Sequence, residues 1–189
     1  NHMNFVLEWF QKNRVSEVVT ICAGCYNYFT KYYSELLNED FNLRVYHILQ
    51  FMSAPQNLKK LNLNYHGKAI TVSYHDACHL RNSSVPIIEE PRIILNSIEN
   101  IKLRELDNNK LNSICCGSGG GVYSSFKGNS DYNTNLILNE NKRVKILLTA
   151  CPFCYTAFNR VREENNIKTL VMKFEDFIIY IMEGGKILS

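Results

Sequence analysis

Seven cysteines are the residues of this 189-residue chain whose types and spacing are best suited to chemistry. They form one isolated position, one adjacent pair and two C-x-x-C pairs: Cys78, Cys115-Cys116, Cys22-x-x-Cys25 and Cys151-x-x-Cys154. Randomly placed cysteines rarely give such spacings, and an odd number cannot form a complete disulfide framework. Thiolates are soft ligands that hold iron and zinc, so the pattern predicts a metal or iron–sulfur site.

Five of these cysteines are expected to meet in one site, namely Cys78, Cys115, Cys116, Cys151 and Cys154. The loops that follow parallel strands converge at one edge of a sheet, which would bring the five sulfur atoms together. Cys151 precedes a predicted helix, whose dipole should lower its thiol pKa and favour ligation. Four cysteines suffice for an ordinary cubane cluster or a zinc ion. Either one thiol is a neighbouring or substrate-reactive group, therefore, or the cluster is of an unusual type.

Residues beside these cysteines are expected to tune the site. His75 and His79 flank Cys78 and could hydrogen-bond or deliver a proton to a bound thiolate; a place at the edge of the core is the equal alternative. Gly117 and Gly119 would let the backbone approach a bulky cluster and donate N–H groups to its sulfur. Asp76 is predicted to cap a helix. Surface solvation is expected for four arginines, with binding of an anionic substrate as the alternative: Arg81, Arg92, Arg160 and Arg162.

Cys22 and Cys25 belong to an internal repeat, because residues 18–29 align with residues 147–158. Each copy consists of a strand, C-x-x-C-Tyr and a helix with Phe on its inward face. The first copy lacks the upstream cysteine and the adjacent pair, so Cys22 and Cys25 are interpreted as an incomplete twin site. Two thiols do not complete a metal site. They could form a local disulfide, act as a thioredoxin-like pair or await further partners.

Short β-branched runs alternating with helical segments are expected to position these loops. Strands are predicted at residues 17–21, 69–74, 101–106, 144–149 and 170–172, and helices at 4–13, 26–37, 92–98, 134–142, 152–164 and 175–182. Residues 45–52 fit either a helix or a strand followed by a helix, and residues 55–67 a connector. The alternation favours an α/β fold: parallel-sheet, Rossmann-like layers with helices on both faces and a pseudo-repeat of strand–C-x-x-C–helix units.

Composition narrows the function classes further. Hydrophobic residues make up 46% of the chain, enough for a packed core, and the net charge of +3 is too small and too dispersed to predict nucleic-acid binding. No apolar run reaches the roughly 20 residues of a spanning helix, and no signal peptide is recognisable. These features predict a cytoplasmic protein, with peripheral attachment to a membrane complex left open.

The order and spacing of five motifs resemble the CCG, or cysteine-rich, domain of the heterodisulfide reductase B subunit. They lie within residues 69–182 and read His75-Asp76-x-Cys78-His79, Glu90-Pro91-Arg92, Cys115-Cys116-Gly117-x-Gly119-Gly120, Cys151-Pro152-x-Cys154 and Phe174-x-Asp176-Phe177. A full member of this family has two complete motifs. Here residues 67–189 resemble one complete repeat, and residues 1–66 resemble the C-terminal tail of an incomplete first repeat.

The resemblance implies a non-cubane [4Fe-4S] cluster bound by Cys78, Cys115, Cys116, Cys151 and Cys154. Zinc in place of iron, or an empty site with oxidised thiols, are the alternatives. The implied function is an iron–sulfur electron-transfer subunit of a heterodisulfide-reductase-like oxidoreductase, acting on a disulfide or organic-acid substrate. Its implied partners are a ferredoxin-type iron–sulfur subunit and a flavin subunit.

Two other functions stay open. The chain could be a non-catalytic iron–sulfur or zinc-bearing assembly module of a glycolate, lactate or glycerol-3-phosphate dehydrogenase or a succinate:quinone reductase complex. The missing half of the first motif is the feature that favours this alternative. The chain could also be a metal-free thiol–disulfide exchanger that uses Cys22 and Cys25, or Cys151 and Cys154.

Overall fold

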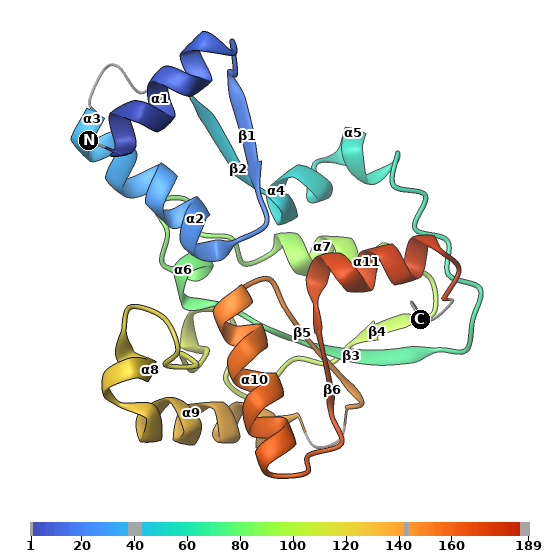
Figure 1. The fold of residues 1–189 in the computed structure, drawn as a ribbon. Helices are drawn as coiled ribbons and strands as arrows, with labels where there is room; N and C mark the ends of the chain where they lie inside the picture. Colours follow the sequence, from blue (N-terminus) through green and yellow to red (C-terminus); the bar gives the residue numbers. More distant parts are fainter. Residues whose placement is uncertain (1, 38–42, 142–143, 186–189) are drawn as a thin grey trace.

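The computed structural model describes residues 2–37, 43–141 and 144–185, and its strands form two parallel sheets (Figure 1). The smaller sheet pairs β1 (Glu17–Thr20) with β2 (Arg44–His47). The larger one has the order β4-β3-β5-β6, with β3 at Ile70–His75, β4 at Ile101–Leu103, β5 at Ile146–Thr149 and β6 at Leu170–Lys173. Every strand pair in both sheets is parallel. The predicted α/β fold class is therefore confirmed.

Helices cover both faces of the larger sheet, as predicted. Helices α9 (Lys127–Glu140) and α10 (Pro152–Glu164) lie on one face, and α7 (Glu90–Asn96) and α11 (Phe174–Met182) lie on the other (Figure 1). Strand β5 consists of apolar residues with a final Thr, as expected for a strand covered on both sides. Phe158 of α10 and Phe174 and Phe177 of α11 are fully buried against this sheet.

The smaller sheet repeats part of the larger one. Strand β1 leads through Cys22 into α2 (Ala23–Asn27), as β5 leads through Cys151 into α10. The paired strand then leads directly into a helix: β2 into α4 (Ile48–Ser53), and β6 into α11. The two parts meet where α2 lies against α6 (Cys78–Arg81) and α4 lies against α7.

Several element boundaries differ from the predictions. Strand β4 ends at residue 103 rather than 106, and α9 begins at residue 127 rather than 134. Helix α7 begins at Glu90 and takes Pro91 into its first turn, where the missing proline N–H is not needed. The predicted helix over residues 26–37 begins at Ala23 and includes a π-helical segment at Tyr28–Tyr33 before α3 (Ser34–Leu37). For residues 45–52, the strand–helix alternative is the correct one.

The remaining elements are short or lie on the surface. They are α1 (His2–Lys12), α5 (Pro55–Leu58), α8 (Val122–Ser125) and a 3-10 helix, η3, at Lys110–Asn112. Helix α1 has no buried residue, and its Phe5 and Trp9 are 64% and 53% exposed. The apolar face of α1 is therefore not packed into the core.

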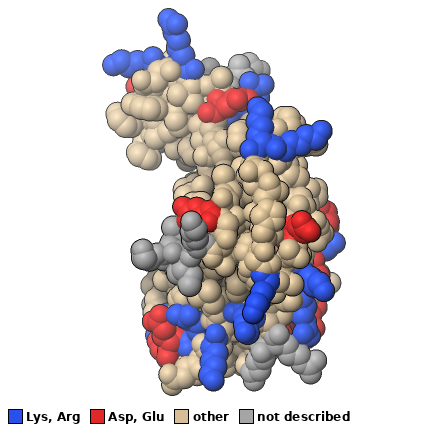
Figure 2. Space-filling view, turned by 90° about the vertical axis from the view of Figure 1, so that its right-hand side faces the viewer, with Lys and Arg blue, Asp and Glu red and all other residues tan. Residues whose placement is uncertain are grey.

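Charged side chains are scattered over the face shown in Figure 2. Lys and Arg side chains of the described residues lie there in separate small groups, with uncharged surface between them. Within the described residues, no helix combines the length and the hydropathy that crossing a membrane requires.

Candidate metal centre

Three loops carry the five cysteines to one edge of the larger sheet. Strand β3 ends at His75, and Cys78 opens α6 shortly after it. Strand β5 ends at Thr149, and Cys151 is the N-cap residue of α10. Cys115 and Cys116 follow η3 in the long loop after β4. Because β3 and β5 are adjacent and parallel, their cysteine-bearing ends lie side by side.

Two pairs of sulfur atoms from different loops are in contact. The Sγ atoms of Cys78 and Cys115 lie 3.6 Å apart, and those of Cys116 and Cys154 lie 3.3 Å apart. The thiols of Cys116 and Cys154 also lower the pKa values of Cys115 and Cys151, respectively. The structure therefore brings together the five cysteines that the sequence grouped. Cys116, Cys151 and Cys154 are buried, whereas Cys78 and Cys115 are only half-buried and form the accessible side of the cluster of thiols.

Electrostatics prevent these thiols from all ionising together. Hydrogen bonds with the Cys116 and Cys78 thiols lower the pKa of Cys115. The same kind of bond, together with burial, raises the pKa of Cys78, Cys116 and Cys154. Cys151 is lowered to a pKa of about 7, first by the Cys154 thiol and then by backbone N–H groups at the start of α10. Only a cationic occupant would allow all five to become thiolates.

The glycine loop after Cys116 is held against α9. Gly117 is buried and has φ of +71°, and a Cβ atom there would lie 3.1 Å from the Cα of Ser130. Its N–H points to the Sγ of Cys115 at 3.4 Å. This contact is the type of N–H to sulfur bond that was expected from the loop. Gly119 lies beside His79, since a Cβ atom at Gly119 would be 3.5 Å from His79 Cε1.

Three polar residues of α9 fix the adjacent cysteines and were not singled out from the sequence. Asn133 Nδ2 donates to the Cys115 carbonyl at 3.1 Å. Ser130 Oγ and Thr134 Oγ1 donate to the Cys116 carbonyl at 3.1 and 3.3 Å, and both residues are fully buried. Their spacing of three and four residues places them on one helix face. That polar stripe was the available signal, but the late predicted start of α9 obscured it.

The two histidines near Cys78 occupy different environments. His75 is fully buried, with Nδ1 3.4 Å from Ser113 Oγ and its ring against Phe158. Burial lowers its pKa to about 4. His79 is half-buried, and its Nδ1 would lie 3.9 Å from a Cβ atom at Gly24. The His79 ring therefore lies between the glycine loop and the start of α2.

Cys22 and Cys25 have the same local geometry as Cys151 and Cys154. Cys22 is the N-cap residue of α2 with φ of −112° and ψ of 120°, and Cys151 has −133° and 121° at α10. Desolvation and then the Cys22 thiol raise the pKa of Cys25, and Cys25 is the more exposed of the two residues. They make no sulfur contact with the other five cysteines among the contacts of the described residues.

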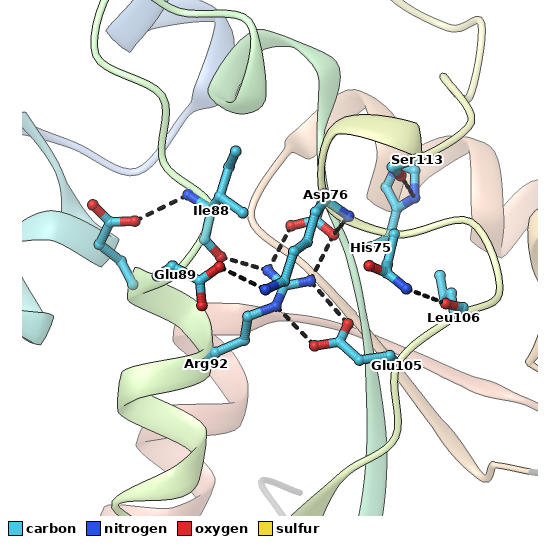
Figure 3. Close-up of polar contacts among 11 residues, drawn as sticks. His75, Asp76, Ile88, Glu89, Arg92, Glu105, Leu106 and Ser113 are labelled. Carbon is cyan, nitrogen blue, oxygen red and sulfur yellow. Dashed lines mark hydrogen bonds and ion pairs between the residues drawn. The ribbon is translucent and has the colours of Figure 1, made fainter.

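Asp76 and Arg92 lie elsewhere than predicted. The N-cap residue of α6 is Ala77, and no side chain caps that helix, so the predicted capping role of Asp76 is wrong. Arg92 is 4% exposed rather than solvated. It forms a buried ion pair with Asp76, drawn in Figure 3. Both predictions failed because the partner residues come from different elements, which sequence spacing does not reveal.

The other three arginines are half-buried and already have polar contacts. Arg81 donates to the Leu111 carbonyl. Arg160 pairs with Asp131 and Glu164, and Arg162 pairs with Glu163. Because of these contacts, the three guanidinium groups are neither simply solvated nor free to bind an anionic substrate.

The donor set fits an iron–sulfur group in kind, although its sulfur atoms are in mutual contact. Five soft thiol ligands converge on one place, which suits iron or zinc. Two thiolates bound to one tetrahedral zinc ion at about 2.3 Å would lie about 3.8 Å apart. Within the described residues, no three His, Cys, Asp or Glu side chains are already placed so that they could hold one metal ion. An occupant would therefore have to separate the sulfur atoms.

Comparison with known proteins identifies the same motif. Residues 72–159 match the model of a family described as "Cysteine-rich domain", CCG. The chain is 33% identical over 156 residues to the D subunit of the dihydromethanophenazine:CoB–CoM heterodisulfide reductase of Methanosarcina barkeri. It is 35% identical over 159 residues to an uncharacterised iron–sulfur protein of Methanococcus maripaludis. It is also 34% identical over 144 residues to the B subunit of the fumarate reductase (CoM/CoB) of Methanothermobacter marburgensis.

These similarities cover most of this chain but only part of each relative. The alignments include 78%, 78% and 72% of the chain. They include 36%, 28% and 26% of the respective relatives, so the chain spans about a third of their length. The resemblance predicted from the cysteine motifs is confirmed.

Proposed function

We propose, from the premise that residues 72–159 belong to the CCG cysteine-rich domain family, that this chain is an iron–sulfur electron-transfer part of a heterodisulfide-reductase-like oxidoreductase. The observation that carries the proposal is the gathering of five cysteines at the edge of the larger sheet, where sulfur contacts of 3.6 and 3.3 Å join the loops that carry them. Relatives named as iron–sulfur proteins and reductase subunits support iron–sulfur chemistry over a purely structural role for these thiols.

Cys78, Cys115, Cys116, Cys151 and Cys154 would hold the group, a non-cubane [4Fe-4S] cluster, because five ligands exceed the four of a cubane. When bound, such a cluster supplies one-electron transfer. The buried Cys116, Cys151 and Cys154 exclude water from its inner side, and the half-buried Cys78 and Cys115 leave its outer side within reach of a substrate. His79, next to Cys78 and beside the glycine loop, would donate a proton at that outer side.

The substrate class that we favour is a disulfide, with an organic acid as the second possibility. Heterodisulfide reductase and fumarate reductase subunits are both among the relatives. The expected partners are a ferredoxin-type iron–sulfur subunit and a flavin subunit of a larger complex, which could lie at the periphery of a membrane. In this proposal, residues 67–189 form the complete repeat and residues 1–66 form the tail of a first one.

A second candidate is a non-catalytic assembly module that carries iron–sulfur or zinc. The observation that favours it is the incomplete twin site, because Cys22 and Cys25 take no part in the sulfur contacts that join the other described cysteines. A module of this kind would dock a catalytic subunit without reacting with substrate itself.

Anaerobic reconstitution with iron and sulfide tests the proposal. The oxidised protein is then examined by electron paramagnetic resonance with and without a small thiol. A cluster signal that changes when the thiol is added is expected for a substrate-reactive site. Stoichiometric zinc in a protein that never yields a cluster signal would favour the assembly module. Full disulfide-reductase activity of the metal-free protein would overturn both metal-based functions.

Cys116→Ser is the companion variant, with Cys25→Ser as its matched control. We expect Cys116→Ser to lose or convert the cluster, because it removes a buried sulfur atom that contacts Cys154 Sγ at 3.3 Å. Cys25→Ser should leave the signal unchanged. A normal signal in Cys116→Ser would show that five-cysteine ligation is wrong.

A further inference from the structure

The buried ion pair behind the cysteine loops uses the full hydrogen-bonding capacity of one arginine. Arg92 donates through Nη1 and Nη2 to the two Asp76 oxygens at 2.8 and 2.9 Å. It donates through Nε and Nη2 to the Glu105 oxygens, both at 2.8 Å, and its fifth N–H reaches the Ile88 carbonyl. Figure 3 shows the guanidinium between the two carboxylates. Every N–H of this side chain therefore has an acceptor.

Asp76 also binds the segment that leads to the adjacent cysteines. The backbone N–H of Lys110 donates to Asp76 Oδ2 at 2.7 Å. Lys110 has φ of +51°, a left-handed conformation that costs free energy for a residue with a side chain. The bond to Asp76 offsets this cost, and it fixes the chain shortly before Cys115.

The same carboxylate therefore connects the two cysteine-bearing segments. Asp76 stands just before Cys78, and Lys110 stands at the start of the turn that ends in Cys115 and Cys116. A second tie runs in parallel, because Ser113 Oγ lies 3.4 Å from His75 Nδ1. The sulfur atoms of Cys78 and Cys115 lie 3.6 Å apart at the far ends of these tied segments.

We propose that Asp76, held by Arg92, is a positioning residue that sets the spacing between Cys78 and the Cys115–Cys116 pair. This inference rests on the proposed function, because the spacing serves a purpose only if the five cysteines hold a metal group together. Stability alone does not account for the pair, since a buried ion pair is often no more stabilising than apolar residues of the same size. Its distinctive feature is the third bond, from Asp76 to the Lys110 backbone, which an apolar replacement could not make.

Two carboxylate variants separate positioning from general stabilisation. Asp76→Asn keeps the size of the side chain but turns one acceptor oxygen into an NH2 group, which must face an N–H of Arg92 or of Lys110. Glu105→Gln perturbs the same arginine, but the Glu105 carboxylate binds Arg92 rather than the cysteine segments, and its side chain is 37% exposed. Arg44→Lys, in the exposed Arg44–Glu17 pair of the smaller sheet, is the remote control.

Cobalt(II) titration of the reduced, metal-free protein provides the readout. Replacing a residue that orients metal ligands typically costs about 10–100-fold in affinity. We expect Asp76→Asn to weaken cobalt binding by at least about tenfold on that scale and to alter the thiolate-to-cobalt charge-transfer spectrum. Glu105→Gln should have a smaller effect, and Arg44→Lys none. Equal losses in Asp76→Asn and Glu105→Gln, or wild-type binding in a folded Asp76→Asn, would overturn the proposal.

Hydrogen exchange of the unmodified protein supplies a test that needs no variant. The Lys110 amide should exchange slowly in the metal-free protein, because its acceptor is a buried carboxylate. Exchange as fast as that of an open loop would contradict the inference even if Asp76→Asn failed to fold. Neither measurement uses iron, so a protein that never forms an iron–sulfur cluster would sink the proposed function and leave these results interpretable.

Discussion

Gly117 decides, as a single residue, how closely the adjacent cysteines approach α9. Its positive φ of +71° and the 3.1 Å separation between a Cβ atom at this position and the Ser130 Cα are independent reasons for glycine. Gly120 has a similar φ of +62° but open space around its Cβ direction. The two glycines thus separate the cost of the backbone conformation from the cost of close packing.

Gly117→Ala should therefore destabilise the protein more than Gly120→Ala. We expect about 1 kcal/mol for the left-handed backbone in either variant and about 1–3 kcal/mol more at Gly117 for the crowding against α9. Urea unfolding of the reduced, metal-free protein measures both. Equal losses in the two variants would mean that the loop and α9 move apart without cost.

At the scale of elements, the junction between β2 and α4 depends on a buried histidine. The Nδ1 of His47 accepts the N–H of Leu49 at 3.3 Å, and Gln50 Oε1 accepts the N–H of His47 at 3.0 Å. These two bonds form a capping box that begins α4. Burial lowers the pKa of His47 to about 4, while backbone groups of Ile21 and Ala150 partly oppose the change.

We therefore expect His47 at this junction to make the protein less stable as the pH is lowered. Between pH 6.5 and about 4 the unfolded chain binds a proton at His47 that the folded protein excludes. The free energy of unfolding consequently increases as the pH rises across this window and decreases as the pH falls. For one such histidine the loss between pH 7 and pH 5 is about 2 kcal/mol.

His47→Asn tests this linkage, because asparagine can cap a helix but does not titrate. Urea unfolding at pH 7 and pH 5 should show a smaller pH dependence for the variant than for the unmodified protein. The buried His75, whose pKa is also lowered to about 4, accounts for part of what remains. An unchanged pH dependence in His47→Asn would contradict the assignment.

At the scale of the whole molecule, the seven cysteines divide into a set of five and a pair. The pair lies at the start of α2, which packs against α6, the helix that begins at Cys78. His79 lies between Gly24 and Gly119, so the start of α2 and the glycine loop lie on either side of one imidazole ring. The set of five and the pair therefore lie close together but remain separate, since no sulfur contact among the described residues joins a member of one to a member of the other.

Thiol counting in the folded, metal-loaded protein tests this division. We expect two thiols per chain to react with an aromatic disulfide reagent under anaerobic conditions, with Cys25 reacting first because it is exposed. The five remaining thiols should react only after the metal is removed or the protein is unfolded. Three reactive thiols in the loaded protein would instead indicate four-cysteine ligation.

The sequence by itself determined the alternation of strands and helices, the repeated strand–C-x-x-C–helix unit and the grouping of the five cysteines. These features are local, since they depend on periodicity and on spacing along the chain. Only the tertiary structure decided the role of Asp76 and Arg92 and the polar contacts of Ser130, Asn133 and Thr134. Each of these depends on a partner that lies on another element, and the free energy of burying a polar group is set by that partner rather than by neighbours in sequence.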